Sequence, residues 1–213
     1  MYKRILEEIE ADKDWRNLEL TNIKIICQKL DNRELNKLIL KSTIPMIYAH
    51  WEGFVVTSLR KVNRYLNSLE YSYSDFHINL LTNAYEDNIK NLDSSLGYDK
   101  RVKHLNIIFE KLTNSVAFST KIDVKSNLKF QVLQDICMRF NLNINSFQEH
   151  KRDLEKLIQI RNSIAHGENA YSFEKYEDIE QYTTLLSNLM DILHIEIEEF
   201  FVDKKYKNRK INL

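Results

Sequence analysis

The amino-acid sequence predicts an all-α protein, a bundle of long antiparallel helices. Apolar side chains recur every three to four residues along most of the chain, which is the spacing of one face of a helix. The 213 residues include only three glycines and one proline, whereas sandwiches and barrels of β-strands use both types in many tight turns. With 43% hydrophobic and 29% charged residues, the chain has the composition of a globular domain with its own core.

The first third of the chain is expected to form two long helices. Helical periodicity begins almost at the first residue and continues to about residue 30. Asp31 is expected to cap the next helix, because Glu34 stands three residues later, as in a capping box. Pro45 either bends this helix or restarts it. From Met46 to Leu69 the periodicity again predicts one long helix.

The middle of the chain is less regular. Helices are expected over residues 74–92, 100–112 and 127–140, and Asn127 is expected to cap the last of them. Residues 117–125 alternate apolar and polar side chains over part of their length. This alternation leaves two alternatives open, a short strand or an extended connection.

Two further helices are expected in the last third. The first starts at a capping box of Ser146 and Glu149 and ends near residue 165. Gly167 follows it, in the place where a residue of left-handed conformation often ends a helix. The second covers residues 175–201. The sequence therefore predicts one helical domain over residues 1–203, followed by a basic C-terminal tail at 204–213.

Charge and composition narrow the functional classes. Lysine and arginine number 31, as do aspartate and glutamate, which excludes a globally basic nucleic-acid-binding protein but leaves room for a local basic surface. The two cysteines lie far apart in apolar stretches, and the histidines lack metal-ligand spacing, so neither a metal nor a cofactor is expected. No apolar run approaches the ~20 residues that span a bilayer. The N-terminus lacks the apolar core of a signal peptide, so we expect a cytoplasmic protein that does not enter a membrane.

One segment combines residue types that suit chemistry on a phosphate. Arg161 falls on the apolar stripe of its helix, where it needs either a partner or a water-filled cleft, because an unpaired buried charge is costly. A guanidinium can grip a phosphate with two parallel hydrogen bonds. His166 ends the same helix, and histidine commonly transfers protons near neutral pH. Metal-free RNA cleavage requires these two functions, deprotonation of the ribose 2′-hydroxyl and stabilisation of the pentacovalent phosphorane.

Two segments resemble the HEPN superfamily of all-α proteins. Arg161-Asn162-x-x-x-His166 is similar to the R-x-x-x-x-H motif of that superfamily, in which a polar residue directly after the arginine is typical. The sequence His-Trp-Glu-Gly-Phe at 50–54 resembles the H-W-E-G-[FY] segment of a prokaryotic branch of HEPN-like nucleases. The resemblance covers about residues 35–200 and implies a HEPN-like helical bundle.

The resemblance implies an endoribonuclease in which Arg161, Asn162 and His166 are catalytic. HEPN ribonucleases are usually independent of metal ions and leave 2′,3′-cyclic phosphate and 5′-hydroxyl ends. They act as dimers whose two motifs face one another, and many are toxins or antiviral-defence effectors that cleave tRNA or mRNA. The implied partners are RNA, a second copy of the chain, and an antitoxin or a defence complex. One subgroup carries an enzymatically modified tyrosine two positions after the histidine, but here that position is Glu168.

Helix geometry independently favours a site composed of two chains. Five residues of a continuous helix rotate by about 140°, so Arg161 and His166 of one chain would point apart. A fraying last turn would bring the two side chains together within one chain, and a second subunit would do so between chains.

Several residues outside the motif are candidates for supporting roles. Glu52 is expected to orient the guanidinium of Arg161, and His50 is a further acid–base candidate. A positive patch is formed by Arg60, Lys61 and Arg64, which either attracts RNA or is an ordinary solvated helix face.

Two other functional classes stay open at this stage. One is a catalytically silent HEPN module that binds RNA, nucleotide or a partner protein in a defence or toxin–antitoxin complex. The other is a purely structural helical protein, in which Arg161 would belong to a buried ion pair.

Overall fold

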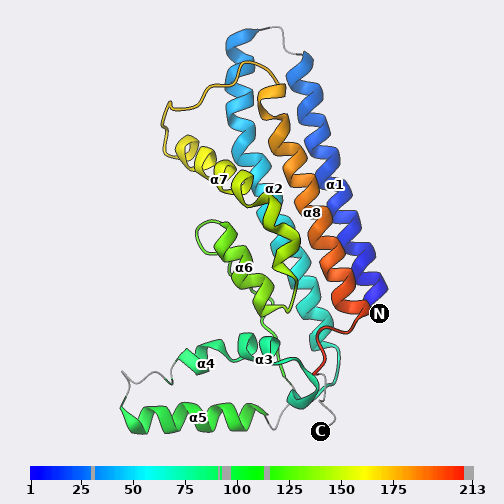
Figure 1. Ribbon diagram of the computed structural model, residues 1–213, viewed down its shortest axis with the longest axis vertical. Helices are drawn as coiled ribbons and strands as arrows, with labels where there is room; N and C mark the ends of the chain where they lie inside the picture. Colours follow the sequence, from blue (N-terminus) through cyan, green and yellow to red (C-terminus); the bar gives the residue numbers. More distant parts are fainter. Residues whose placement is uncertain (30–31, 91, 93–96, 113–115, 209–213) are drawn as a thin grey trace.

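Three long helices run along the length of the molecule (Figure 1). A computed structural model describes residues 1–29, 32–90, 92, 97–112 and 116–208. The long helices are α1 (Tyr2–Lys29), α2 (Arg33–Asn67) and α8 (Glu177–Val202). Helix α1 is antiparallel to both α2 and α8. The prediction of an all-α bundle with long antiparallel helices is therefore confirmed, and the described residues contain no regular strand.

The long helices are held together by aliphatic and aromatic side chains that recur at helical spacing. Trp51 and Phe54 on α2 are completely buried. Full burial of one large apolar side chain contributes roughly 1.5–3 kcal/mol to folding, so this core dominates the stability of the bundle. Completely buried aliphatic side chains on the three helices include Ile9, Leu40, Ile44, Ile47, Leu186, Leu189 and Ile197.

Helix α2 begins with a side-chain cap and continues through its proline. The side chain of Asn32 accepts hydrogen bonds from the backbone N–H groups of Glu34 and Leu35, both at 3.1 Å. Asp31, the expected cap, lies outside the described residues. Pro45 falls inside the helix, which extends without a break from Arg33 to Asn67.

Helix α7 (Lys151–Ala165) carries the candidate motif and packs across α2 (Figure 1). A 3₁₀ segment, η2 (Ile144–His150), precedes it, so the predicted capping box at residues 146 and 149 is wrong. Ser146 donates its hydroxyl hydrogen to Glu196 of α8 at 2.5 Å instead. Helix α6 (Phe130–Arg139) also begins later than predicted, and Asn127 does not cap it.

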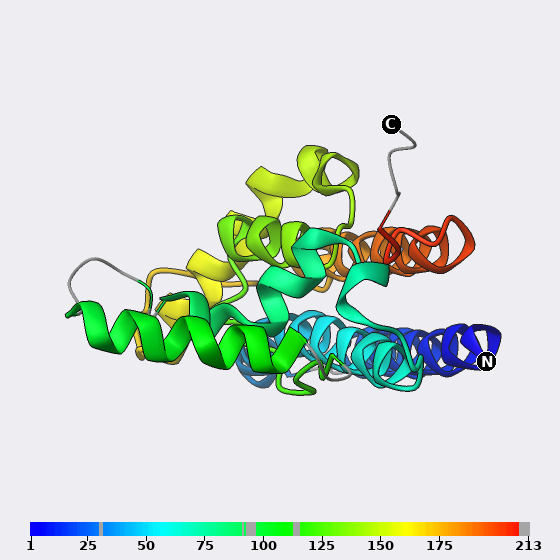
Figure 2. The same ribbon diagram turned by 90° about the horizontal axis from the view of Figure 1, so that it is seen from below.

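An arm at one end of the bundle contains η1 (Tyr73–Asp75), α3 (Ile78–Ala84), α4 (Glu86–Lys90) and α5 (Tyr98–Leu112), as Figures 1 and 2 show. The described residues from 116 to 129 return from this arm as an extended connection without a regular strand. The side-chain amide of Asn67 holds this connection against α2, because it pairs with both the N–H and the carbonyl of Phe118, at 2.7 and 2.8 Å.

The described part of the C-terminal tail folds back onto the domain. Tyr206 is 4% exposed, and its carbonyl accepts a hydrogen bond from the N–H of His77 at 2.7 Å. Residues 209–213 lie outside the described part of the chain. No described helix combines the length and apolar character needed to cross a bilayer.

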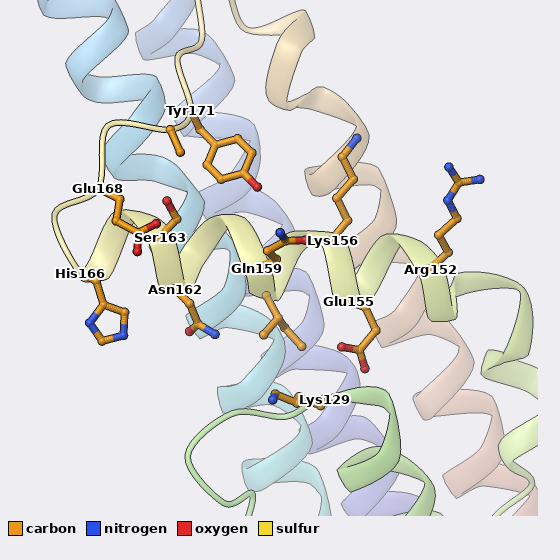
Figure 3. A pocket seen from close by; sticks show the side chains of 12 residues that line it. Lys129, Arg152, Glu155, Lys156, Gln159, Asn162, Ser163, His166, Glu168 and Tyr171 are labelled. Carbon is orange, nitrogen blue, oxygen red and sulfur yellow. The ribbon is translucent and has the colours of Figure 1, made fainter.

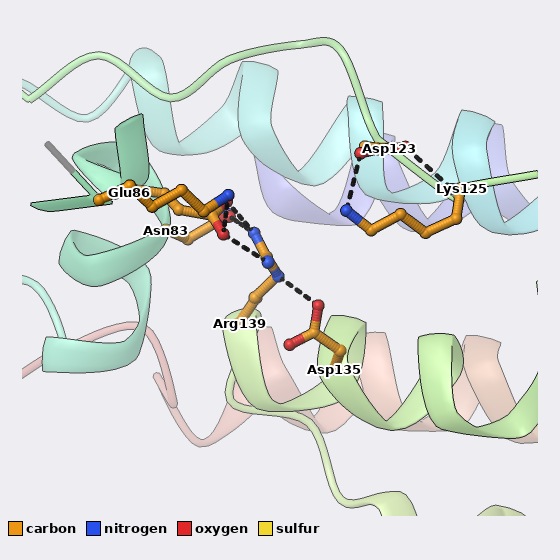
Figure 4. Close-up of polar contacts among 7 residues, drawn as sticks. Asn83, Glu86, Asp123, Lys125, Asp135 and Arg139 are labelled. Carbon is orange, nitrogen blue, oxygen red and sulfur yellow. Dashed lines mark hydrogen bonds and ion pairs between the residues drawn. The ribbon is translucent and has the colours of Figure 1, made fainter. Parts of the chain in front are cut away.

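Ion pairs around Arg139 connect α6 to the arm (Figure 4). Its Nη2 donates to Glu86 at 2.7 Å and its Nε donates to Asp135 at 2.9 Å, while Nη1 contacts the second carboxylate oxygen of Glu86. Hydrogen bonds from Arg139 and Lys90 lower the pKa of Glu86 to about 2. The ionised form of Glu86 therefore stabilises the contact between α4 and α6.

We expect Arg139→Ala to destabilise the arm by about 1.5–3 kcal/mol at pH 6, the range for hydrogen bonds to charged groups. A carboxylate whose pKa is lower in the folded state stabilises at pH values above its unfolded pKa of about 4.3, and this stabilisation is lost as the pH falls toward 2. Protection of α4 amides from hydrogen exchange should therefore differ between variant and wild type at pH 6 and converge near pH 2. The control is Lys125→Ala, which removes an exposed pair with Asp123; an equal effect of both substitutions would contradict this role of Arg139.

Candidate functional site

The end of α7 is fixed by backbone hydrogen bonds. Gly167 has a φ of +75°, and its N–H bonds to the carbonyl of Ile164 at 3.1 Å, while the N–H of Glu168 bonds to the carbonyl of Ser163 at 3.0 Å. These two bonds form a Schellman motif, as expected from the glycine. His166 is the last residue before the turn. Its exposed side chain is therefore carried on a defined helix end, and none of these bonds depends on the imidazole.

Among the described residues, Arg161 has only uncharged partners. Its Nη1 donates to the side-chain oxygens of Asn127 at 2.9 Å and Asn162 at 3.0 Å. The guanidinium carbon lies 4.9 Å from the ring centroid of Tyr48, so the aromatic face supports the cation. In the described part of the chain, no carboxylate lies within ion-pair distance of this half-buried group. Without an ion pair in the described chain, its positive charge suits an incoming anion.

Tyr48 holds together the surroundings of Arg161. Its hydroxyl donates to Glu52 at 2.7 Å and accepts the backbone N–H of Leu128 at 2.6 Å. Burial, followed by the hydrogen bond to Glu52, raises the pKa of Tyr48, so the phenol stays protonated. Glu52 therefore fixes the ring on which the guanidinium lies, and the ring fixes the segment that supplies Asn127. A direct contact between Glu52 and Arg161 is not present among the described residues.

Asn162 and His166 line an open pocket of about 810 Å³ on the outer face of α7 (Figure 3). The two residues are one helical turn apart, so their side chains lie on the same face. Arg161 faces Tyr48 and Asn127 instead. Asn162 is the link between these regions, because it accepts from Arg161 and also lines the pocket. The described chain shows no direct contact between Arg161 and His166.

A family model described as RiboL-PSP-HEPN matches residues 11–199 of the chain. The chain belongs to the RiboL-PSP-HEPN family. The match covers nearly the whole helical domain, including the segments at 50–54 and 161–166. HEPN domains bind RNA and often dimerise, and they are generally ribonucleases. No curated protein and no solved structure matches the chain.

His50 of this HEPN domain lies on the α1 side of α2. Its Nε2 is 3.3 Å from the carboxylate of Glu19, and its carbonyl accepts a hydrogen bond from Arg16 at 3.0 Å. Burial lowers the pKa of His50, which favours the neutral imidazole. A Cβ at Gly53 would lie 2.9 Å from Nη1 of Arg16, so a larger residue there would displace this guanidinium. The structure therefore places His50 in the joint between α1 and α2 and not beside Arg161.

The three residues of the predicted positive patch have different surroundings in the HEPN fold. Arg60 and Arg64 are exposed, and Arg60 donates to the carbonyl of Thr120 at 3.3 Å. Lys61 is half-buried and donates to the carbonyl of Glu8 on α1 at 2.5 Å. Burial lowers the pKa of Lys61. The patch begins about two turns beyond Glu52 along α2.

Sequence reasoning missed two residues of this site, Tyr48 and Asn127. Tyr48 precedes Glu52 by one helical turn, so a search for neighbours of Glu52 on the same helix face would have found it. No local pattern pointed to Asn127, which reaches Arg161 through the tertiary fold. Among the residues that the structure describes, no group of three or more His, Cys, Asp or Glu side chains could hold a metal ion.

Proposed function

We propose that this HEPN domain is a metal-independent endoribonuclease that acts as a toxin or as an effector of antiviral defence. The observation that carries the proposal is the guanidinium of Arg161, which has no ion pair in the described chain. It is supported by Tyr48 and two amides and is bonded to the residue that shares a pocket with His166. Such a cation matches the charge that develops on a phosphate under attack.

In the proposed reaction, His166 accepts the proton of a ribose 2′-hydroxyl as its oxygen attacks the adjacent phosphorus. The bond from phosphorus to the 5′-oxygen breaks, and that oxygen takes up a proton from water to leave as a 5′-hydroxyl, while His166 releases its proton to solvent. The other product is a 2′,3′-cyclic phosphate. Arg161 stabilises the phosphorane oxygens, and Asn162 holds the guanidinium in line with the pocket.

The test of this chemistry uses RNA cleavage in EDTA. We expect cleavage to persist in the chelator, since both proposed functions belong to side chains of the protein. A substrate with 2′-O-methyl or deoxyribose at the cut site should remain intact, because it lacks the attacking hydroxyl. Strict dependence on added magnesium or manganese would instead indicate a metal-assisted reaction.

We further propose that the active form is a homodimer with a composite site. Arg161 and His166 lie on different sides of α7 in one chain, so a second copy would supply the missing half of each site. Large apolar side chains are exposed on one stripe of α2, at Leu35, Leu38 and Met46. Glu52 follows Leu38 by about four turns of the same helix, so the proposed dimer face and the residues around Arg161 share α2.

Leu38→Glu should therefore separate the dimer and reduce cleavage together. Light scattering at micromolar concentration measures the first effect, and the rate of RNA cleavage measures the second. The matched control is Leu105→Glu, which places the same charge on an exposed apolar position of α5. A fully active wild-type monomer would contradict the composite site. A monomer that binds RNA without cleaving it would favour the silent HEPN module instead.

A further inference from the structure

The pocket beside His166 extends well beyond the motif. Its wall follows α7 from Arg152 to His166, a length of roughly 21 Å at helical rise. Figure 3 shows Arg152 and Lys156 projecting on the same side of α7 as Tyr171, while Lys129 lies across from them on the segment before α6. The pocket is thus a trough with cationic groups on both sides and His166 at one end.

The cations of this trough have no partners within the described chain. Lys129, Arg152 and Lys156 are exposed and make no ion pair or side-chain hydrogen bond there. Some other cations of the bundle are paired, as Arg33 is with Glu174 and Lys24 is with Glu180. A row of unpaired cations along one wall is suited to the regularly spaced phosphates of a nucleic acid.

The lining of the trough carries three cations against two carboxylates, and no ion pair joins them in the described chain. Glu155 is engaged by the backbone N–H of Phe130 at 2.9 Å, and Glu168 lies beyond the end of α7. Ser163 lines the same wall, is 7% exposed, and its hydroxyl has no hydrogen-bond partner among the described residues. The trough therefore offers net positive charge, while the Ser163 hydroxyl is itself buried behind the wall.

Tyr171 adds a surface for a base. It is half-buried against the core, and its ring stands over the trough beside α7 (Figure 3). Aromatic rings stack on unpaired bases without regard to sequence, and this stacking is typical of single-stranded nucleic-acid sites. A duplex would not expose its bases to such a ring, so the trough fits a single strand.

We infer that this trough binds the single-stranded RNA next to the cut, with Arg152, Lys156 and Lys129 on its phosphates and Tyr171 stacked on a base. The inference rests on the proposed function in placing the cut near His166. The segment 127–129 links the two regions, since Asn127 contacts Arg161 and Lys129 lines the trough. One RNA strand can thereby contact Arg161 and continue along α7.

The test is binding of a fully 2′-O-methylated single-stranded RNA, measured by fluorescence anisotropy in EDTA. The double variant Arg152→Glu/Lys156→Glu should raise Kd at least tenfold at physiological salt. It should also reduce the magnitude of the slope of log K, where K is the association constant, against the logarithm of salt concentration by roughly 1–2. The matched control, Lys100→Glu/Lys103→Glu, makes the same charge change on exposed positions of α5 and should alter Kd less than twofold. Equal effects of both double variants, or no RNA binding by the wild type, would overturn the inference.

Tyr171 variants test stacking separately from charge. Tyr171→Phe keeps the ring and should bind as the wild type does, whereas Tyr171→Leu should lose about fivefold or more in affinity. Unchanged binding by Tyr171→Leu would overturn the placement of a base there. A polyglutamate peptide that binds the trough as tightly as RNA would identify it as a site for an acidic protein and also overturn the inference.

These measurements separate the trough from the nuclease proposal, because the probe cannot be cleaved. Loss of binding in the double variant, with no cleavage of ordinary RNA by the wild type, would support the trough and contradict the nuclease. Cleavage by the wild type with unchanged binding in the double variant would support the nuclease and overturn the trough.

Discussion

His166→Ala is expected to abolish RNA cleavage while leaving the fold intact. Proton transfer by a positioned side chain contributes typically ~10²–10⁴-fold to a rate, and the proposed reaction has no other imidazole in the pocket wall. The side chain is exposed, and the end of α7 is held by backbone bonds around Gly167. Single-turnover cleavage of a labelled RNA measures the rate, and thermal unfolding measures the fold.

His150→Ala is the matched control for this prediction. His150 stands at the other end of the same helix, beside the exposed carboxylate of Glu149. The His150→Ala variant should cleave RNA at the wild-type rate if activity depends on the position of His166 and not on the loss of any histidine. Unchanged cleavage by His166→Ala would remove the proposed base and leave Arg161 as part of a binding site only.

The fold could be predicted from the sequence because its main determinant is periodic. Apolar spacing locates α1, α2 and α8 to within a few residues, since each buries one continuous stripe. Helix starts were harder to predict, because capping residues have other uses. The Ser146 hydroxyl bonds to Glu196, and the Asn127 side chain bonds to Arg161, so both matched a cap pattern without acting as caps.

The candidate site was predictable only where its residues are close in sequence. Arg161, Asn162 and His166 form a local motif, so their types and spacing were visible. Tyr48 and Asn127 come from a different helix and a connection, and only packing of α7 against α2 brings them to the guanidinium. The same packing explains why Glu52 supports Arg161 through the Tyr48 ring and not by direct contact.

Arg161→Lys should reduce turnover by roughly 10²–10³-fold, the range for removal of one preorganised donor to a developing charge. Lysine keeps the positive charge, so RNA affinity should change little. An ammonium, however, cannot lie flat on the Tyr48 ring, bond to both amides and still present two parallel donors to a phosphate. Measured kcat should therefore fall in this variant, while the measured Kd for RNA should stay close to the wild-type value.

Glu52→Gln distinguishes positioning of the guanidinium from a merely structural role for its surroundings. The amide keeps the shape of the side chain and still accepts the Tyr48 hydroxyl, but the bond loses its charge assistance. We expect kcat to fall by less than in Arg161→Lys, while Kd and the unfolding temperature stay close to wild type. A large loss of thermal stability in Arg161→Lys with unchanged cleavage in both variants would show that this cluster is structural. If Glu52→Gln alone matches the wild type, the Tyr48 ring is held firmly enough by Leu128 and the core, and the site depends on α7 and Asn127.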